Sequence, residues 1–148
     1  MKLEIKKTEY KHMSEVIQLL KGISPYFPQE DTYESIWKSF VGQANIHTRV
    51  IIYKGLVVGY GAIIIETKIR GNKLGHIEDI ASHKDFRNQG IGATIVNTLF
   101  EIASTQGCYK VVLQCNPNQL GFYEKCSFKI GGQGMQKFNT ELTPSIGK

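Results

Sequence analysis

The segment Arg87-Asn88-Gln89-Gly90-Ile91-Gly92 places one cation and two glycines between a predicted strand and a predicted helix. The two glycines would let the backbone turn tightly and present its N–H groups outward. With the positive end of the following helix, these amides would form a cradle suited to a pyrophosphate, and Arg87 would add charge. The spacing matches neither a Walker loop nor a Rossmann fingerprint. Taken alone, the segment fits either an anion site or a structural turn.

Two adjacent carboxylates, Glu78 and Asp79, interrupt an apolar strand predicted over residues 75–82. Burying them would be costly unless they face a site or a partner. Because neighbouring strand residues point to opposite faces, both can face one pocket only if the strand bulges there. Such a carboxylate can take the proton from an attacking amine, directly or through water. The alternative is that one of the two is an ordinary surface charge.

Tyr123 lies in the aromatic segment Phe122-Tyr123-Glu124-Lys125-Cys126-Ser127-Phe128. A phenol has an ordinary pKa of about 10, so it stays protonated at neutral pH and can donate a hydrogen bond to a leaving group. The alternative is that Tyr123 is an ordinary aromatic residue packed on its helix. His76 precedes the two carboxylates, and we interpret it as structural because it is a lone histidine near a strand start.

The three cysteines are Cys108, Cys115 and Cys126. They have neither the paired spacing of a zinc site nor the even count of a disulfide framework. We therefore expect free thiols in a reducing compartment. No metal site is predicted, and no neighbouring base would make one of these thiols a nucleophile.

The elements that must position these residues follow from hydrophobic periodicity and turn signals. Strands are predicted over residues 3–5, 48–53, 56–67, 75–82, 110–115, 128–130 and 135–138. Helices are predicted over residues 13–20, 32–41, 91–104 and 120–125. The first half is a meander, which favours antiparallel pairing, and the second half has a βαβ order, which favours a parallel pair. The expected fold class is α/β with a mixed sheet.

The chain has 148 residues, which suit a single domain over residues 1–148 with its own core. Residues 141–148 are expected to form a frayed tail. There are 18 basic and 13 acidic residues, a net charge of +5, without the dense basic run typical of nucleic-acid binding. No apolar run approaches a membrane span and the N-terminus lacks a signal peptide, so we expect a cytoplasmic protein without a nucleic-acid or membrane partner.

In combination, the glycine loop, the carboxylate pair and the aromatic segment resemble the GNAT superfamily of N-acetyltransferases over about residues 56–130. The resemblance implies a mixed, mostly antiparallel sheet flanked by helices, with a splayed strand pair that holds acetyl-CoA. It also implies that Glu78, Asp79 and Tyr123 are catalytic. The residues that it implies for cofactor binding are Ile80, Ala81, Arg87, Asn88, Gln89, Gly90, Ile91, Gly92, Asn116 and Tyr123.

Within that superfamily, the stretches 75–80, 107–110 and 122–126 are most similar to the glucosamine-6-phosphate N-acetyltransferase family. This similarity implies direct attack of the 2-amine of D-glucosamine 6-phosphate on acetyl-CoA. The products would be CoA and N-acetyl-D-glucosamine 6-phosphate, a precursor of UDP-N-acetylglucosamine. An intertwined homodimer is also implied. The residues implied to bind the sugar phosphate are Glu78, Asp79, Lys68, Tyr109, Lys110 and Lys137.

The chain departs from that family at several positions. The family's arginine near the C-terminus is absent, and Lys137 is the only nearby cation, without the bidentate fork of arginine. Lys21 replaces a threonine of the family, Gln114 replaces an acidic residue, and the loop before Gly75 is shorter. Two alternatives stay open. One is an acetyltransferase for another amine, such as a peptide N-terminus, a polyamine or an antibiotic; the other is a non-catalytic module that binds CoA or nucleic acid.

Overall fold

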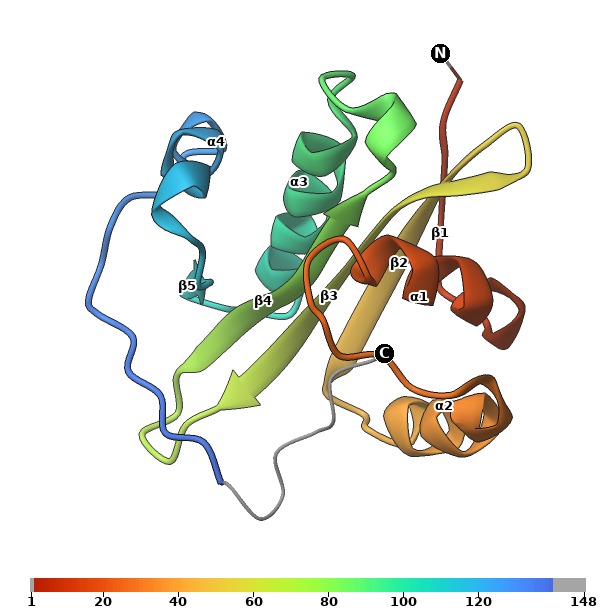
Figure 1. Cartoon of the computed structure of the whole chain (residues 1–148). Coiled ribbons are helices and arrows are strands. Elements are labelled where there is room, and N and C mark those ends of the chain that lie inside the picture. Colours follow the sequence, from red (N-terminus) through yellow and green to blue (C-terminus); the bar gives the residue numbers. More distant parts are fainter. Residues whose placement is uncertain (1, 140–148) are drawn as a thin grey trace.

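Five strands form one sheet at the centre of the structure, a computed structural model that describes residues 2–139 (Figure 1). In sheet order, the strands are β1 (Glu4–Lys6), β2 (Ile46–Tyr53), β3 (Leu56–Thr67), β4 (Lys73–Ser82) and β5 (Lys110–Val112). The first four strands pair antiparallel, and β4 pairs with β5 in parallel. The predicted mixed α/β sheet is thus confirmed. The tail expected over residues 141–148 lies outside the described residues.

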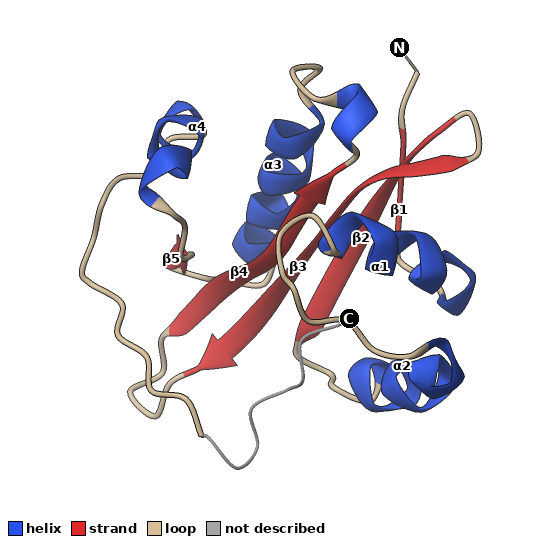
Figure 2. Ribbon diagram, viewed as in Figure 1, coloured by secondary structure: helices blue, strands red, loops and turns tan. Residues whose placement is uncertain are grey.

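Helices cover both faces of the sheet. They are α1 (Met13–Leu20), α2 (Tyr33–Val41), α3 (Ile91–Thr105) and α4 (Leu120–Lys125). Helix α1 packs on one face and α3 on the other (Figure 2). Helix α2 lies beside the turn that precedes α1, where the ring centroids of Tyr10 and Trp37 are 6.2 Å apart. None of the helices in the described range is long and apolar enough to cross a membrane.

The core has one layer on each side of the sheet. Beneath α3, Ile95 and Leu99 are fully buried in the same cluster as Ile63. Helix α3 can approach this closely because Gly61 has no side chain, and a Cβ there would collide with Ile95. Helix α1 covers the second layer, which contains the buried Tyr60. The two layers hold β3 and β4 in a fixed register between them.

Strand β4 contains a bulge, which is the condition under which both carboxylates can face one pocket. Ala62 pairs with Glu78 and Tyr60 pairs with Ala81, so two residues of β4 lie opposite one residue of β3. Asp79, inside the bulge, has a left-handed backbone with φ of 57°. Aspartate is one of the few residues besides glycine that adopt this conformation readily, so the residue type suits the backbone.

Strands β4 and β5 form a splayed pair. They are paired only where residues 74–76 of β4 lie opposite residues 110–112 of β5. Strand β4 then continues to Ser82, whereas β5 ends at Val112, and the two diverge (Figure 1). The strand predicted over residues 110–115 is therefore shorter than expected. Its early end creates the gap that a splayed pair requires.

The strands predicted over residues 128–130 and 135–138 are wrong for this chain by itself, since both stretches are irregular. Their apolar side chains are largely exposed, with 72% for Ile130, 94% for Met135 and 67% for Phe138. An extended segment becomes a strand only when another strand satisfies its backbone N–H and C=O groups. Within the described residues, neither stretch has such a neighbour.

Candidate active site

The bulge in β4 places two carboxylates beside the gap. Glu78 shares a face of the sheet with its cross-strand partner Ala62, on the side that α1 covers. Asp79 lies near Tyr60 of the same face. Burial, and secondly the charge of Asp79, raises the pKa of Tyr60. A strand without the bulge would have turned one of the two carboxylates away.

The carboxyl of Asp79 is partly desolvated, and this burial raises its pKa. A carboxylate with a raised pKa binds a proton more readily than an ordinary aspartate does. Both Glu78 and Asp79 still reach solvent, so a small amine can approach them. The bulge therefore presents two reachable proton acceptors on one face of the sheet.

Ile80 and Ala81 follow the bulge on the part of β4 that borders the gap. In the chain as described, no strand pairs with this edge of β4 beyond His76. Backbone N–H groups without a strand partner are free to bind an extended ligand, as in strand addition at a sheet edge. These amides can therefore hold a ligand that enters between β4 and β5.

The glycine loop leads directly into α3. Residues 87–90 are exposed, and Asn88 and Gly90 both have left-handed backbones, with φ of 63° and 79°. The first backbone hydrogen bond of α3 runs from the Thr94 N–H to the Gly90 carbonyl at 2.9 Å. The amides of residues 91–93 therefore precede the helical bonding pattern and remain available to an anion. No ion pair engages Arg87 among the described residues.

Gly92 also has a packing role that the sequence did not indicate. It lies inside α3 rather than in the turn, and a Cβ at this position would come within 3.0 Å of the Phe122 ring. The missing side chain lets α4 approach the start of α3. Phe122 in turn packs edge-on against Tyr123, with ring centroids 4.9 Å apart. Through its contact with Phe122, Gly92 therefore helps to fix the position of Tyr123 relative to the start of α3.

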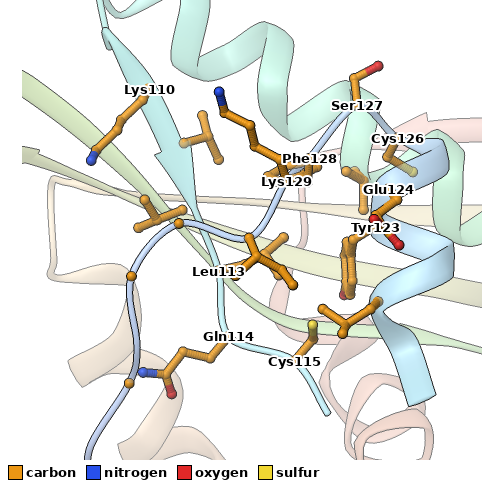
Figure 3. A pocket seen from close by; sticks show the side chains of 18 of the residues that line it. Lys110, Leu113, Gln114, Cys115, Tyr123, Glu124, Cys126, Ser127, Phe128 and Lys129 are labelled. Carbon is orange, nitrogen blue, oxygen red and sulfur yellow. The ribbon is translucent and has the colours of Figure 1, made fainter. Parts of the chain in front are cut away.

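Tyr123 is only 8% exposed and lines a cavity of about 1050 Å³ (Figure 3). Its ring packs edge-on against Phe128 at 6.0 Å, and the thiols of Cys115 and Cys126 lie near it. Burial, and then the two thiols, raises the pKa of Tyr123. The phenol therefore stays protonated and can act as a hydrogen-bond donor. Cavity walls come from α3, β5, α4 and residues 126–136.

Lys68 lies far from Glu78 and Asp79 along the sheet. It lies in the β3–β4 hairpin, with its ammonium 3.3 Å from the Glu66 carboxylate. That carboxylate also pairs with Nε2 of His76 at 2.9 Å, and these hydrogen bonds lower the pKa of Glu66. Glu78 pairs with Ala62, six residues before Lys68. At roughly 3.3 Å per residue, the backbone of Lys68 is therefore about 20 Å along the hairpin from that of Glu78. This separation is longer than a sugar phosphate.

The other expected acceptor residues are dispersed. Tyr109 precedes β5 and Lys110 begins it. The Lys110 ammonium lies over the Tyr109 ring, 5.6 Å from its centroid, and both residues are exposed. Lys137 lies in the irregular C-terminal segment. Asn116 begins the turn before α4, where its N–H donates to the side-chain oxygen of Gln119 at 2.9 Å. Within residues 2–139, Glu78 and Asp79 lie together at the β4 bulge and Tyr123 lines the cavity beside β5, whereas the expected cations do not gather into one phosphate site.

Sequence reasoning missed Tyr60 and the two thiols beside Tyr123. Tyr60 was visible only as an aromatic residue in a strand, and its proximity to Asp79 depends on the register of β3 with β4. Cys115 and Cys126 are separated in sequence by the whole of α4. The described residues contain no cluster of His, Cys, Asp and Glu that could hold a metal ion.

Comparison with known proteins assigns the class. The chain belongs to the acetyltransferase (GNAT) family, whose model matches residues 13–128. Glucosamine 6-phosphate N-acetyltransferase from Trypanosoma brucei brucei is 30% identical over 90% of this chain and 94% of that protein. The enzyme of that name from Candida albicans is 42% identical, over 55% of this chain and 56% of its own length. The crystal structure of the Arabidopsis thaliana enzyme superposes with a TM-score of 0.86 at 26% identity, covering 94% of this chain and 99% of that one.

Proposed function

We propose that this protein transfers the acetyl group of acetyl-CoA to the 2-amine of D-glucosamine 6-phosphate. The products are CoA and N-acetyl-D-glucosamine 6-phosphate. The observation that carries the proposal is the bulged β4, which diverges from β5 and presents Glu78 and Asp79 beside the gap. The names of the full-length relatives support the choice of acceptor.

Acetyl-CoA fits the residues at the gap. The amides of residues 91–93 and the cation of Arg87 would bind the pyrophosphate. The pantetheine arm would then lie between β4 and β5, where the backbone amides around Ile80 and Ala81 hydrogen-bond to it. The same amides would stabilise the negative charge on the thioester oxygen during attack. Preorganised donors of this kind supply much of the rate enhancement in acyl transfer.

Proton transfer is divided between the two sides of the gap. Glu78 is the proposed relay that takes the proton from the ammonium of the sugar, and Asp79 beside it binds the amine. The phenol of Tyr123 donates its proton, or a hydrogen bond, to the sulfur of CoA as the thioester breaks. The amine attacks directly, so no acetyl-enzyme intermediate forms and no cysteine takes part.

A homodimer would complete the acceptor site. The segment 126–139 exposes Ile130, Met135 and Phe138, and it borders the cavity beside the outer edge of β5. A second copy can use this edge for strand pairing and bring its own Lys137 toward the carboxylates. This arrangement accounts for the lack of a phosphate site within one chain. We place the reaction in amino-sugar metabolism in the cytoplasm, consistent with the three free cysteines.

A different acceptor amine is the second candidate. The distance of about 20 Å between Lys68 and Glu78, at roughly 3.3 Å per residue, favours it if no partner supplies a cation. The two candidates separate when release of CoA thiol is followed with glucosamine 6-phosphate, glucosamine, a polyamine or a peptide. We expect rapid release with the sugar phosphate and slow release with glucosamine. Release with another amine but none with the sugar phosphate would overturn the proposed acceptor.

A further inference from the structure

Two thiols lie on either side of the Tyr123 ring. Cys115 follows β5, Cys126 ends α4, and both are partly exposed. Both line the cavity together with Tyr123, and both interact with its phenol. Figure 3 shows the sulfur of Cys115 and the hydroxyl of Tyr123 directed toward the same part of the cavity. The proposed mechanism does not use either thiol.

The hydroxyl of Tyr123 has an unfilled hydrogen-bonding capacity. The residue is more than nine-tenths buried, and in the described part of the chain its hydroxyl has no hydrogen-bond partner. The hydroxyl is not fully enclosed, because Thr8 Oγ1 is the one buried side-chain polar atom without a partner among the described residues. The Tyr123 hydroxyl can therefore bond a polar atom of a ligand in the cavity that this residue lines. Under the proposed function, that atom is the sulfur of CoA.

We propose that Cys115 is a modification site that forms a mixed disulfide with CoA. The inference rests on the proposed function, because that function places the CoA sulfur at Tyr123. Cys115 lies against the same phenol, so a sulfur bound there is close to the Cys115 thiol. The ligand is CoA disulfide, which is two CoA molecules joined through their sulfurs. One CoA half would bind as acetyl-CoA does, so that the S–S bond takes the place of the thioester.

The exchange is balanced without a further oxidant. The Cys115 thiol loses its proton, and the thiolate attacks the sulfur of the bound CoA half. The S–S bond of the CoA disulfide breaks as the bond between Cys115 and that sulfur forms. The other CoA leaves as a thiolate and takes up the proton. One thiol and one disulfide are consumed, and one thiol and one disulfide are produced.

The environments of the three cysteines favour Cys115. Burial raises the pKa of Cys126, so its thiolate is less available. Burial also raises the pKa of Cys108, which lies outside the cavity before β5. Cys115 combines partial exposure with a place beside the Tyr123 hydroxyl. The adduct would fill the acetyl-CoA site, so activity should fall in proportion to the modified fraction and return after reduction.

Mass spectrometry of the whole protein tests the inference. The protein is incubated with CoA disulfide, with or without excess acetyl-CoA, and then digested with trypsin without reductant. Cleavage after Arg87, Lys110, Lys125 and Lys129 puts Cys108, Cys115 and Cys126 on separate peptides. We expect one CoA adduct on peptide 111–125, blocked by acetyl-CoA and removed by dithiothreitol. The adduct should be absent from Cys115→Ser and present in the matched Cys126→Ser.

Calorimetric titration with CoA separates the possible failures. If CoA binds but no adduct forms, or if the adduct lies on another peptide, the inference is wrong and the proposed function stands. If CoA does not bind, both the proposed function and the inference about Cys115 are wrong. Peptide mapping of the wild-type protein decides the site even where a serine variant fails to fold.

Discussion

At the scale of single residues, burial shifts the pKa values of two side chains in directions that suit the proposed reaction. Burial raises the pKa of Asp79 and so makes its carboxylate a better proton acceptor. Burial also raises the pKa of Tyr123 and so keeps its phenol protonated. Under the proposed function, Asp79 would bind the amine beside the Glu78 relay, and Tyr123 would donate to the departing sulfur. Tyr123→Phe removes the hydroxyl and Asp79→Asn removes the negative charge, and each leaves the side chain at nearly the same size.

Tyr123→Phe should lower kcat on the order of 10²-fold, because the departing sulfur would lose its proton donor. The KM for acetyl-CoA should change little, since the pyrophosphate cradle is untouched. Steady-state kinetics with both substrates measure the two constants. Direct titration with CoA serves as the control for binding. An unchanged kcat would remove Tyr123 from the mechanism.

Asp79→Asn should raise the free energy of unfolding at pH 7. The pKa of Asp79 is raised by folding, so its stabilising contribution is full below its unfolded pKa and is lost as pH rises through the folded one. The difference between variant and wild type should therefore vanish below about pH 3.9, the ordinary value. Asparagine also tolerates the left-handed backbone with φ of 57°. Urea unfolding at both pH values tests this, and a variant less stable at pH 7 would contradict it.

At the scale of elements, a helix, strand or turn could be predicted from the sequence only where neighbouring residues determine it. The Lys54-Gly55 turn, α1 and α3 follow from neighbouring residues. The two adjacent charges in β4 only made a bulge the condition for both to face one pocket. The segment 128–130 looks like a strand but needs a strand partner, and none of residues 2–139 provides one. The separation of Lys68 from Glu78 is fixed only by hairpin register. Features that depend on a neighbouring strand or on a second copy of the chain cannot be recognised from the adjacent residues in the sequence.

Gly61→Ala tests the packing of α3 on the sheet. The added Cβ would collide with Ile95, so we expect a loss of about 1–3 kcal/mol in the free energy of unfolding. Gly121→Ala is the matched control, because a Cβ there meets nothing within 4 Å. Urea titration of both variants measures the difference. Equal stability of the two variants would show that α3 packs less tightly than described.

At the scale of the whole molecule, the net charge of +5 suits two small anionic ligands, CoA and a sugar phosphate, better than an extended nucleic acid. Among the described residues of one chain, nothing pairs with the outer edge of β5, and Ile130, Met135 and Phe138 are exposed. The proposed dimer would cover both and supply the missing cation. In the proposed arrangement, the acetyl-CoA site would lie within one chain, whereas the acceptor site would be shared.

Met135→Glu should convert the proposed dimer to a monomer, because it puts a charge into the apolar segment. Sedimentation velocity measures the change. Ile69→Glu is the matched control, since Ile69 is equally exposed but lies in the β3–β4 hairpin. We expect the control to sediment as the wild type does. A wild-type protein that sediments as a monomer at all concentrations would exclude the shared acceptor site.

Transfer of a labelled acetyl group tests the central claim most directly. The protein is mixed with glucosamine 6-phosphate and acetyl-CoA labelled with ¹³C at the acetyl carbonyl, and the products are followed by NMR and intact-protein mass spectrometry. Direct attack by the 2-amine predicts that the label appears as an amide coupled to the proton on C2 of the sugar, without any acetylated protein. Label that accumulates on the protein, or that never reaches the sugar nitrogen, would contradict it.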